Sequence, residues 1–108
     1  MRLAKLLGGF TSLYSSNLLE AELLSVMRRE SVERAEVPAL QSLSWVLPDR
    51  RLGPELEKVL AAGYLRGADL WHVACCLYLV DRAGGVRFVT VDERQASVAL
   101  AVGLDVVS

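Results

Sequence analysis

The sequence has no long hydrophobic run, only two cysteines and a single histidine, and each shortage excludes a class of protein. No apolar stretch is both long enough and free enough of charge to cross a bilayer, and "MRLAKLLGGF" is too short for the core of a signal peptide. Cys75 and Cys76 are neighbours in an apolar segment and cannot bridge, so we expect buried thiols in a reducing compartment. One histidine and two unsuitable cysteines argue against zinc. These absences predict a cytoplasmic protein without a membrane segment.

The sequence also lacks an excess of charge of either sign. Its 12 basic and 13 acidic residues give a formal net charge of −1. This balance excludes a global basic field, so any contact with nucleic acid must rely on a local patch or a metal. Arg28-Arg29 and Arg50-Arg51 are candidates for such a patch, although paired basic residues are usually solvated helix ends or loops. Apolar residues make up 53% of the 108, which predicts one domain over residues 1–108 with a real core.

Helical and extended segments alternate along the chain. Capping pairs begin two of the helices, Asn17 with Glu20 and Asp92 with Gln95, and glycines end several others. The expected helices cover residues 2–7, 17–30, a short piece around Leu40, 54–62, 68–83 and 92–102. The expected strands cover residues 10–16, 44–47, 86–91 and 105–108. The alternation predicts an α/β fold, a three-layer arrangement in which helices flank both faces of a mostly parallel sheet.

Two carboxylates stand out against this pattern. Asp69 shares the i, i+4, i+7, i+11 stripe of an apolar helix with Val73, Cys76 and Val80. An acid in a first helical turn also gains about 0.3–1 kcal/mol from the helix dipole, so the stripe alone leaves both a structural and a functional reading open. Asp92 has the spacing of an N-cap, yet it follows a strand directly, at the sheet edge where ligands of parallel α/β folds bind.

A third acid comes from "SSNLLEAELLS", where periodicity does not choose between Glu20 and Glu22. The capping pair with Asn17 gives Glu20 another duty and favours Glu22. Two carboxylates ~5 Å apart repel by about 3 kcal/mol at an effective dielectric of ~20, so such a cluster needs protonation or a cation. If the acids converge, hard oxygen ligands in an open site suit Mg²⁺ or Mn²⁺ acting on phosphate.

Three stretches resemble successive motifs of the PIN-domain superfamily, and of VapC-type toxin ribonucleases in particular. They are "YSSNLLEAELL", "LRGADLWHVACCLYL" and "FVTVDERQASVALAVGLDVV". They occur in the family's order, and the likeness covers essentially the whole chain from Thr11 onward. The resemblance assigns the family's acids to Glu22, six residues after Ser16, to Asp69 and to Asp92. It also puts Thr90 beside the last of these.

The resemblance implies a fold, a chemistry and partners. It implies a PIN-like domain and a Mg²⁺- or Mn²⁺-dependent endoribonuclease, in which a metal-activated water hydrolyses RNA and Glu22, Asp69 and Asp92 bind the metal. The implied partners are an RNA substrate, a cognate antitoxin protein and a second copy in a homodimer. Ser16, Thr90 and His72 are the candidate supporting residues. His72, one helical turn after Asp69, could orient that carboxylate or could simply be a packed histidine.

The chain departs from the family pattern at its beginning. The family starts with a central strand that ends in an Asp followed by Ser or Thr, whereas this sequence starts with "MRLAKLLGG". We therefore expect an N-terminally truncated domain, with a gap between the strands formed by residues 11–15 and 86–91. A catalytically impaired remnant or protein-interaction module of the same fold is the alternative. A phosphohydrolase with a nucleophilic Asp is a weaker one, since no such Asp follows an N-terminal strand.

Overall fold

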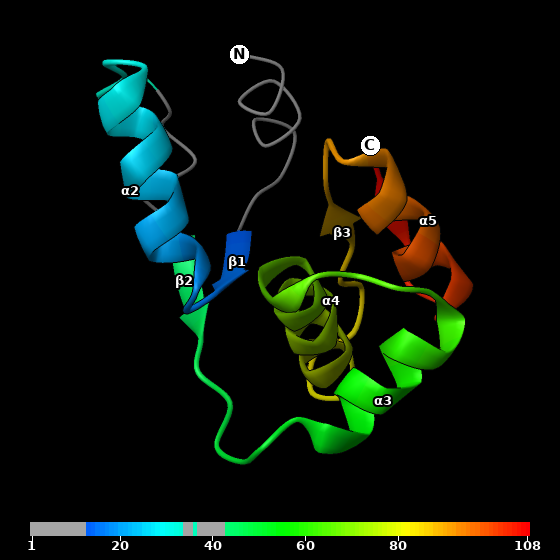
Figure 1. Ribbon diagram of the computed structural model, residues 1–108. Coiled ribbons are helices and arrows are strands. Elements are labelled where there is room, and N and C mark those ends of the chain that lie inside the picture. The colour runs from blue at the N-terminus through cyan, green and yellow to red at the C-terminus, as the bar shows by residue number, and fades with distance from the viewer. Residues whose placement is uncertain (1–12, 34–35, 37–42) are drawn as a thin grey trace. The chain divides into compact units, whose positions relative to one another are not determined.

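The structure, a computed structural model, describes residues 13–33, 36 and 43–108, and the chain divides into two compact units, Met1–Leu47 and Pro48–Ser108. The described part has four helices and four short strands, and the strands pair in parallel, which confirms the predicted α/β class (Figure 1). The pairing is β1 with β2 and β3 with β4, in two two-stranded sheets. The helices predicted over residues 2–7 and around Leu40 lie outside the described residues. That residues 1–108 form one domain stays a prediction.

The first unit contains one parallel strand pair and one helix. β1 (Leu13–Ser16) and β2 (Leu43–Val46) align with Leu13 opposite Leu43 and Ser16 opposite Val46. β1 falls within its predicted segment, 10–16, and β2 begins and ends one residue before the predicted 44–47. Leu13, Val46 and Met27 of the intervening helix are buried.

The helix of the first unit, α2 (Leu19–Arg29), begins two residues later than expected. The prediction of Asn17 as its N-cap is wrong. Leu18 occupies the cap position with helical backbone angles (φ −71°, ψ −30°) and makes no side-chain cap bond. Glu20 and Glu22 lie in the first turn, where acidic side chains complement the helix dipole.

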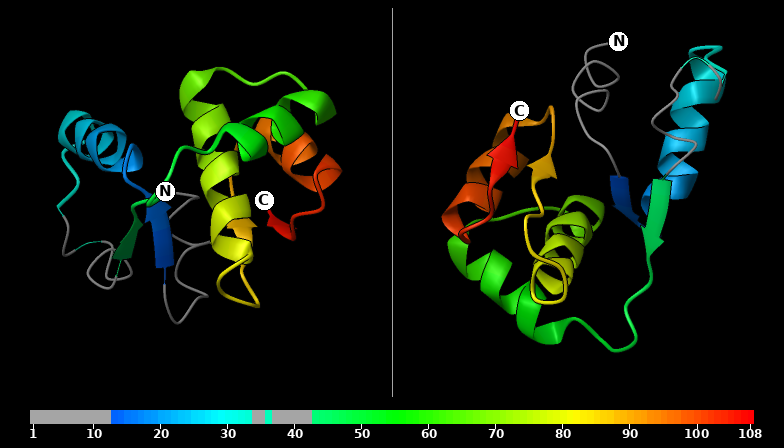
Figure 2. Two further views of the ribbon diagram at one scale, coloured as in Figure 1. Left: turned by 90° about the horizontal axis from the view of Figure 1, so that it is seen from below. Right: turned by 180° about the vertical axis from the view of Figure 1, so that it is seen from behind.

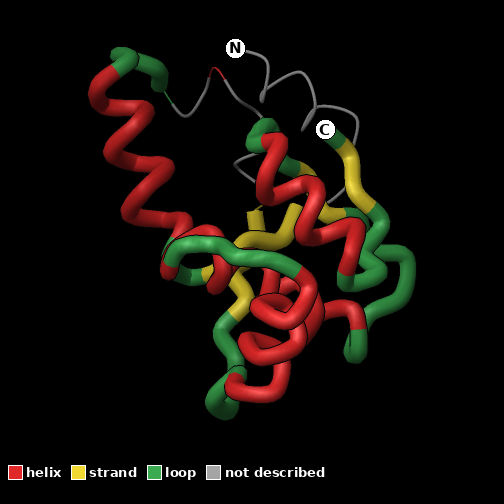
Figure 3. Tube along the Cα trace, turned by 45° about the vertical axis from the view of Figure 1, so that its right-hand side comes forward, coloured by secondary structure: helices red, strands yellow, loops and turns green. Residues whose placement is uncertain are grey.

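The second unit contains three helices and a second parallel strand pair. These elements are α3 (Gly53–Ala62), α4 (Gly67–Val80), β3 (Phe88–Val89), α5 (Glu93–Ala101) and β4 (Val106–Val107). Phe88 lies opposite Val106, and the two strands lie side by side next to α5 (Figure 2). Figure 3 shows that helices predominate over strands in this unit. The strands are shorter than the predicted 86–91 and 105–108: only Phe88 pairs with Val106 and Val89 with Val107.

Helix ends in the second unit follow the predicted signals, with one exception. Pro54 lies in the first turn of α3, and Gly103 ends α5 with φ +91°. The exception is α4, which ends at Val80 and not near Ala83, because the chain tightens into a turn there, with the Arg82 N–H donating to the Leu79 carbonyl at 2.9 Å.

Gly63 ends α3 for a reason that the sequence does not reveal. Its φ is 173°, an extended conformation open to any residue, so backbone freedom is not the reason. A Cβ at this position would lie 2.8 Å from Val98 Cγ2 of α5. Glycine therefore permits the close approach that closes the core, whose buried members are Val59, Leu65, Val73, Val98, Ala99 and Leu104.

The longest described helix, α4, has 14 residues. Within residues 13–33 and 43–108, no helix combines the length and apolar character that a membrane span requires.

Candidate functional site

A hydrogen-bonded turn after β3 positions Asp92. Thr90 is buried, and its hydroxyl accepts from the Asp92 backbone N–H at 3.1 Å and donates to Gln95 Oε1 at 2.7 Å. Asp92 Oδ1 accepts from the Gln95 backbone N–H at 2.8 Å. Asp92 is therefore the N-cap of α5, as its spacing from Gln95 predicts. Its side chain is exposed, so capping one N–H leaves the carboxylate accessible.

The Gln95 side chain connects this turn to the start of α4. Gln95 is 7% exposed, and its Nε2 donates to the backbone carbonyl of Asp69 at 3.3 Å. The starts of α4 and α5, where Asp69 and Asp92 lie, are thus held together within the second unit. Sequence reasoning found Gln95 only as a capping partner. The contact with α4, which lies 26 residues away, depends on how the two helices pack.

Asp69 does not cap its own helix. It lies in the first turn of α4, but the cap residue is Arg66, which has an extended backbone and makes no side-chain cap bond. The Asp69 side chain is half-buried. Of its predicted stripe, Val73 is fully buried, whereas Val80 is 39% exposed. The helix dipole remains a structural reason for an acid at this position, whereas capping of the helix is not one.

The third candidate acid belongs to the first unit. Ser16 is the buried last residue of β1, and Glu22 is an exposed residue in the first turn of α2. Glu20 is also exposed, in the same turn. Because Asn17 is not the N-cap, the capping duty that favoured Glu22 over Glu20 is lost. The assignment of Glu22 stays a prediction that relies on the six-residue spacing from Ser16.

His72 is half-buried on α4, three residues after Asp69. The spacing places it near the same side of the helix as Asp69. Its supporting role stays a prediction.

The donor chemistry of these acids suits a hard divalent cation. Carboxylate oxygens in a partly open site are the ligands that Mg²⁺ and Mn²⁺ prefer. The second unit supplies two of them, Asp69 and Asp92, from helix starts joined by Gln95. Within the described part of each unit, no group of three or more His, Cys, Asp or Glu side chains could hold a metal ion. The assignment of Glu22 as a third ligand stays a prediction.

The cysteines do not contribute to this chemistry. Both are free; Cys75 is buried and Cys76 half-buried. Burial raises the pKa of the Cys75 thiol to about 12 and that of Cys76 to about 11. Neither forms the thiolate that a nucleophile or a soft-metal ligand needs near neutral pH.

One of the two predicted basic pairs has a structural role. The Arg50 guanidinium forms a bidentate pair with Glu55, with Nη1–Oε1 at 3.0 Å and Nη2–Oε2 at 2.5 Å. Tyr78 lies close by: its ring centroid is 5.5 Å from Arg50 Cζ and 3.7 Å from Arg82 Cζ, and its hydroxyl donates to Asp49 Oδ1 at 2.9 Å. These contacts fasten the loop before α3 to the C-terminal half of α4. Arg50 is therefore committed to Glu55 and does not supply a free basic charge.

Comparison with known proteins gives one match. A sequence model described as the PIN domain matches residues 1–101, nearly the whole chain. No curated protein and no solved structure matches the chain significantly.

Proposed function

Because the chain belongs to the PIN domain family, we propose that it is a divalent-metal-dependent endoribonuclease of the toxin–antitoxin type. PIN domains have a nuclease fold in general, they are generally dependent on divalent metals, and PIN nucleases typically bind RNA. The observation that supports the proposal is the Gln95 link, which joins the Asp69 turn to the Asp92 turn. In the proposal, Asp69, Asp92 and Glu22 bind Mg²⁺ or Mn²⁺.

The proposed roles follow from what each side chain can do. A divalent cation, when bound, would supply a Lewis acid for the phosphodiester and lower the pKa of water. Thr90 and Gln95 hold the Asp92 turn, so the Asp92 carboxylate does not have to reorganise when it meets a ligand. Ser16 and His72 support Glu22 and Asp69 in the same proposal. The proposal includes a cytoplasmic location, a homodimer and an antitoxin that blocks the active groove.

The test is cleavage of a labelled mixed-sequence single-stranded RNA with Mg²⁺, with Mn²⁺ and with EDTA. We expect cleavage only with a divalent ion, and losses of more than about 100-fold in Asp69→Asn, Asp92→Asn and Glu22→Gln. Glu20→Gln is the matched control, since Glu20 is an exposed acid of the same turn. Mn²⁺ binding followed by electron paramagnetic resonance gives a readout that does not depend on activity. Cleavage in EDTA, or equal losses for Glu20 and Glu22, would contradict the proposal.

A catalytically impaired remnant or protein-interaction module is the second candidate. It is favoured by the distribution of the acids, since the linked helix starts of the second unit supply two of the proposed ligands, Asp69 and Asp92. Two ligands and abundant waters bind Mg²⁺ weakly. Folded protein that neither binds Mn²⁺ nor cleaves RNA would support this candidate over the first.

A further inference from the structure

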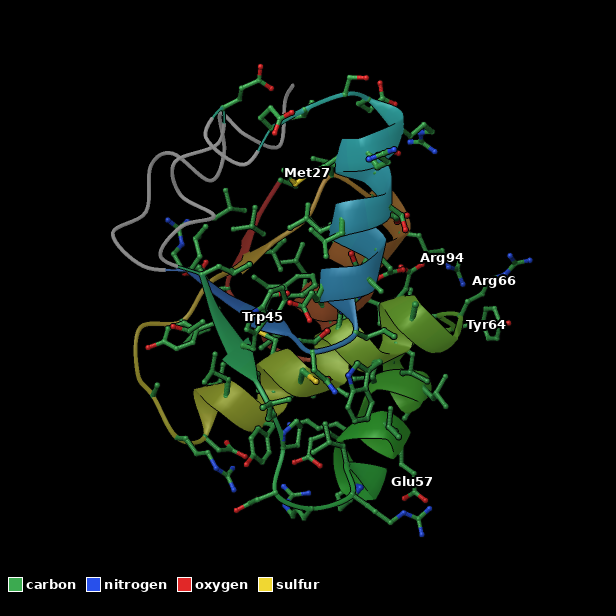
Figure 4. All side chains as sticks on the ribbon, turned by 90° about the vertical axis from the view of Figure 1, so that its left-hand side faces the viewer. Met27, Trp45, Glu57, Tyr64, Arg66 and Arg94 are labelled. Carbon is green, nitrogen blue, oxygen red and sulfur yellow. The ribbon has the colours of Figure 1, made fainter. Side chains whose placement is uncertain are left out.

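Two exposed arginines lie at the helix starts that carry the two acids, and an exposed tyrosine lies shortly before the first of these helices. Arg66 is the N-cap residue of α4, three residues before Asp69, and Arg94 lies in the first turn of α5, two residues after Asp92. Tyr64 lies in the short connection between α3 and α4. Figure 4 shows all three side chains on one flank of the second unit, pointing outward.

A hydrogen bond fixes one of these arginines against the tyrosine backbone. Arg94 Nε donates to the Tyr64 carbonyl oxygen at 3.1 Å. This contact orients the guanidinium, while its two Nη groups remain available as donors in a fixed fork. The Tyr64 residue is 65% exposed, so its ring is accessible to a ligand.

Charge pairing distinguishes these arginines from most others in the second unit. Arg50, Arg82 and Arg87 form ion pairs with Glu55, Asp49 and Asp105. Within residues 48–108, Arg66 and Arg94 form no such pair with a carboxylate. Arg51 is also unpaired, but it lies before α3, whereas Tyr64 lies after it. The 10 residues of α3 span about 15 Å, so Arg51 lies at the opposite end of this helix from Tyr64.

We propose that Arg66, Arg94 and Tyr64 form a binding site for single-stranded RNA beside the two acids. The inference rests on the proposed function and names how that site holds its substrate. The guanidiniums bind backbone phosphates, and the Tyr64 ring stacks on an unpaired base. A phosphate chain that approaches Asp69 and Asp92 meets like charge. The two arginines at the same helix starts offset that repulsion.

The first test measures phosphate contacts by fluorescence anisotropy, with a 12-nucleotide fluorescein-labelled mixed-sequence RNA in EDTA, where cleavage does not interfere. We expect Arg66→Gln and Arg94→Gln each to weaken binding about tenfold and to lower the slope of log K against log salt by about 0.7. Arg94→Lys keeps the charge and restores the slope. Arg87→Gln is the matched control, because Arg87 is exposed but paired with Asp105.

The second test measures stacking with Tyr64→Leu, which keeps an apolar side chain and removes the ring. We expect about tenfold weaker binding of single-stranded RNA, with the salt slope unchanged, and no effect on a duplex of the same length, whose bases are already paired. Circular dichroism melting verifies that each variant is folded.

The outcomes separate this inference from the proposed function. If the wild type binds RNA through these residues but does not cleave it with Mg²⁺ or Mn²⁺, the inference holds and the nuclease proposal fails. If the wild type cleaves RNA but all three variants bind as it does, the inference is wrong and the nuclease proposal stands. If the wild type binds no RNA, the inference is wrong, and a protein partner becomes the candidate for this flank.

Discussion

Gln95 and Asp69 meet across two helices: the Gln95 Nε2 donates to the Asp69 carbonyl oxygen at 3.3 Å. The same side chain accepts from the Thr90 hydroxyl at 2.7 Å, and the Gln95 backbone N–H donates to Asp92. One buried residue therefore contacts the two acids of the second unit and the threonine beside them. Its side chain joins the backbone at Asp69 to Thr90 in the turn that carries Asp92.

Replacing this amide tests whether it holds the site together. Gln95→Leu leaves the buried Thr90 hydroxyl without its acceptor and the Asp69 carbonyl without its donor. An unsatisfied buried group costs about 1–3 kcal/mol, so we expect the free energy of unfolding in urea to fall by about 2 kcal/mol. Ser97→Ala, at an exposed position of α5, is the control. Thr90→Val combined with Gln95→Leu is expected to cost less than the sum of the single changes. Strict additivity would mean that the two side chains do not act together.

Asp92 has two candidate duties, and two substitutions separate them. Asp92→Asn keeps an oxygen for the Gln95 backbone N–H, and asparagine caps as well as aspartate, so we expect stability to change by less than about 0.5 kcal/mol. Asp92→Ala removes the cap and is expected to lose about 1 kcal/mol. If Asp92 is a metal ligand, both variants lose RNA cleavage and Mn²⁺ affinity equally. Asp92→Asn with wild-type cleavage and Mn²⁺ binding would show that Asp92 is only a cap.

Patterns within about four residues predicted most of the second unit. The spacing of Asp92 and Gln95 identified the α5 cap, and Pro54 with Gly63 gave the bounds of α3 to within one residue. The same reasoning failed at Asn17, where the backbone of Leu18 is already helical and takes over the cap position.

Contacts between distant residues were beyond local patterns. Gln95 reaches Asp69 over 26 residues, and Tyr78 reaches Asp49 over 29, so both depend on how the helices pack. The arginine pair shows the same limit. Arg50 and Arg51 look equivalent in sequence, but only Arg50 pairs with the buried Glu55. Which basic residues remain free for a substrate was therefore decided by the fold.

The Arg50–Glu55 pair makes stability depend on pH. The hydrogen bond from Arg50 lowers the pKa of the Glu55 carboxyl below its usual 4.5. A folded-state pKa below the unfolded one means that this contribution is fully present above about 4.5 and is lost as pH falls through the folded value. We expect Glu55→Gln to lower Tm near pH 7 but to have less effect near pH 3. Glu57→Gln, at an exposed position of the same helix, controls for the loss of a charge. An equal Tm difference at both pH values would contradict this role.

Gly63 tests the packing of α3 on α5. A Cβ there would lie 2.8 Å from Val98 Cγ2, so we expect Gly63→Ala to lower the free energy of unfolding by about 1–3 kcal/mol through overpacking. Gly84→Ala is the matched control, because a Cβ at Gly84 has no atom within 4 Å. Val98→Ala removes the opposing methyl groups, so the double variant is expected to lose less than the sum of the two single losses. If Gly63→Ala is harmless, or if the two losses simply add, the close approach of α3 to α5 does not depend on glycine.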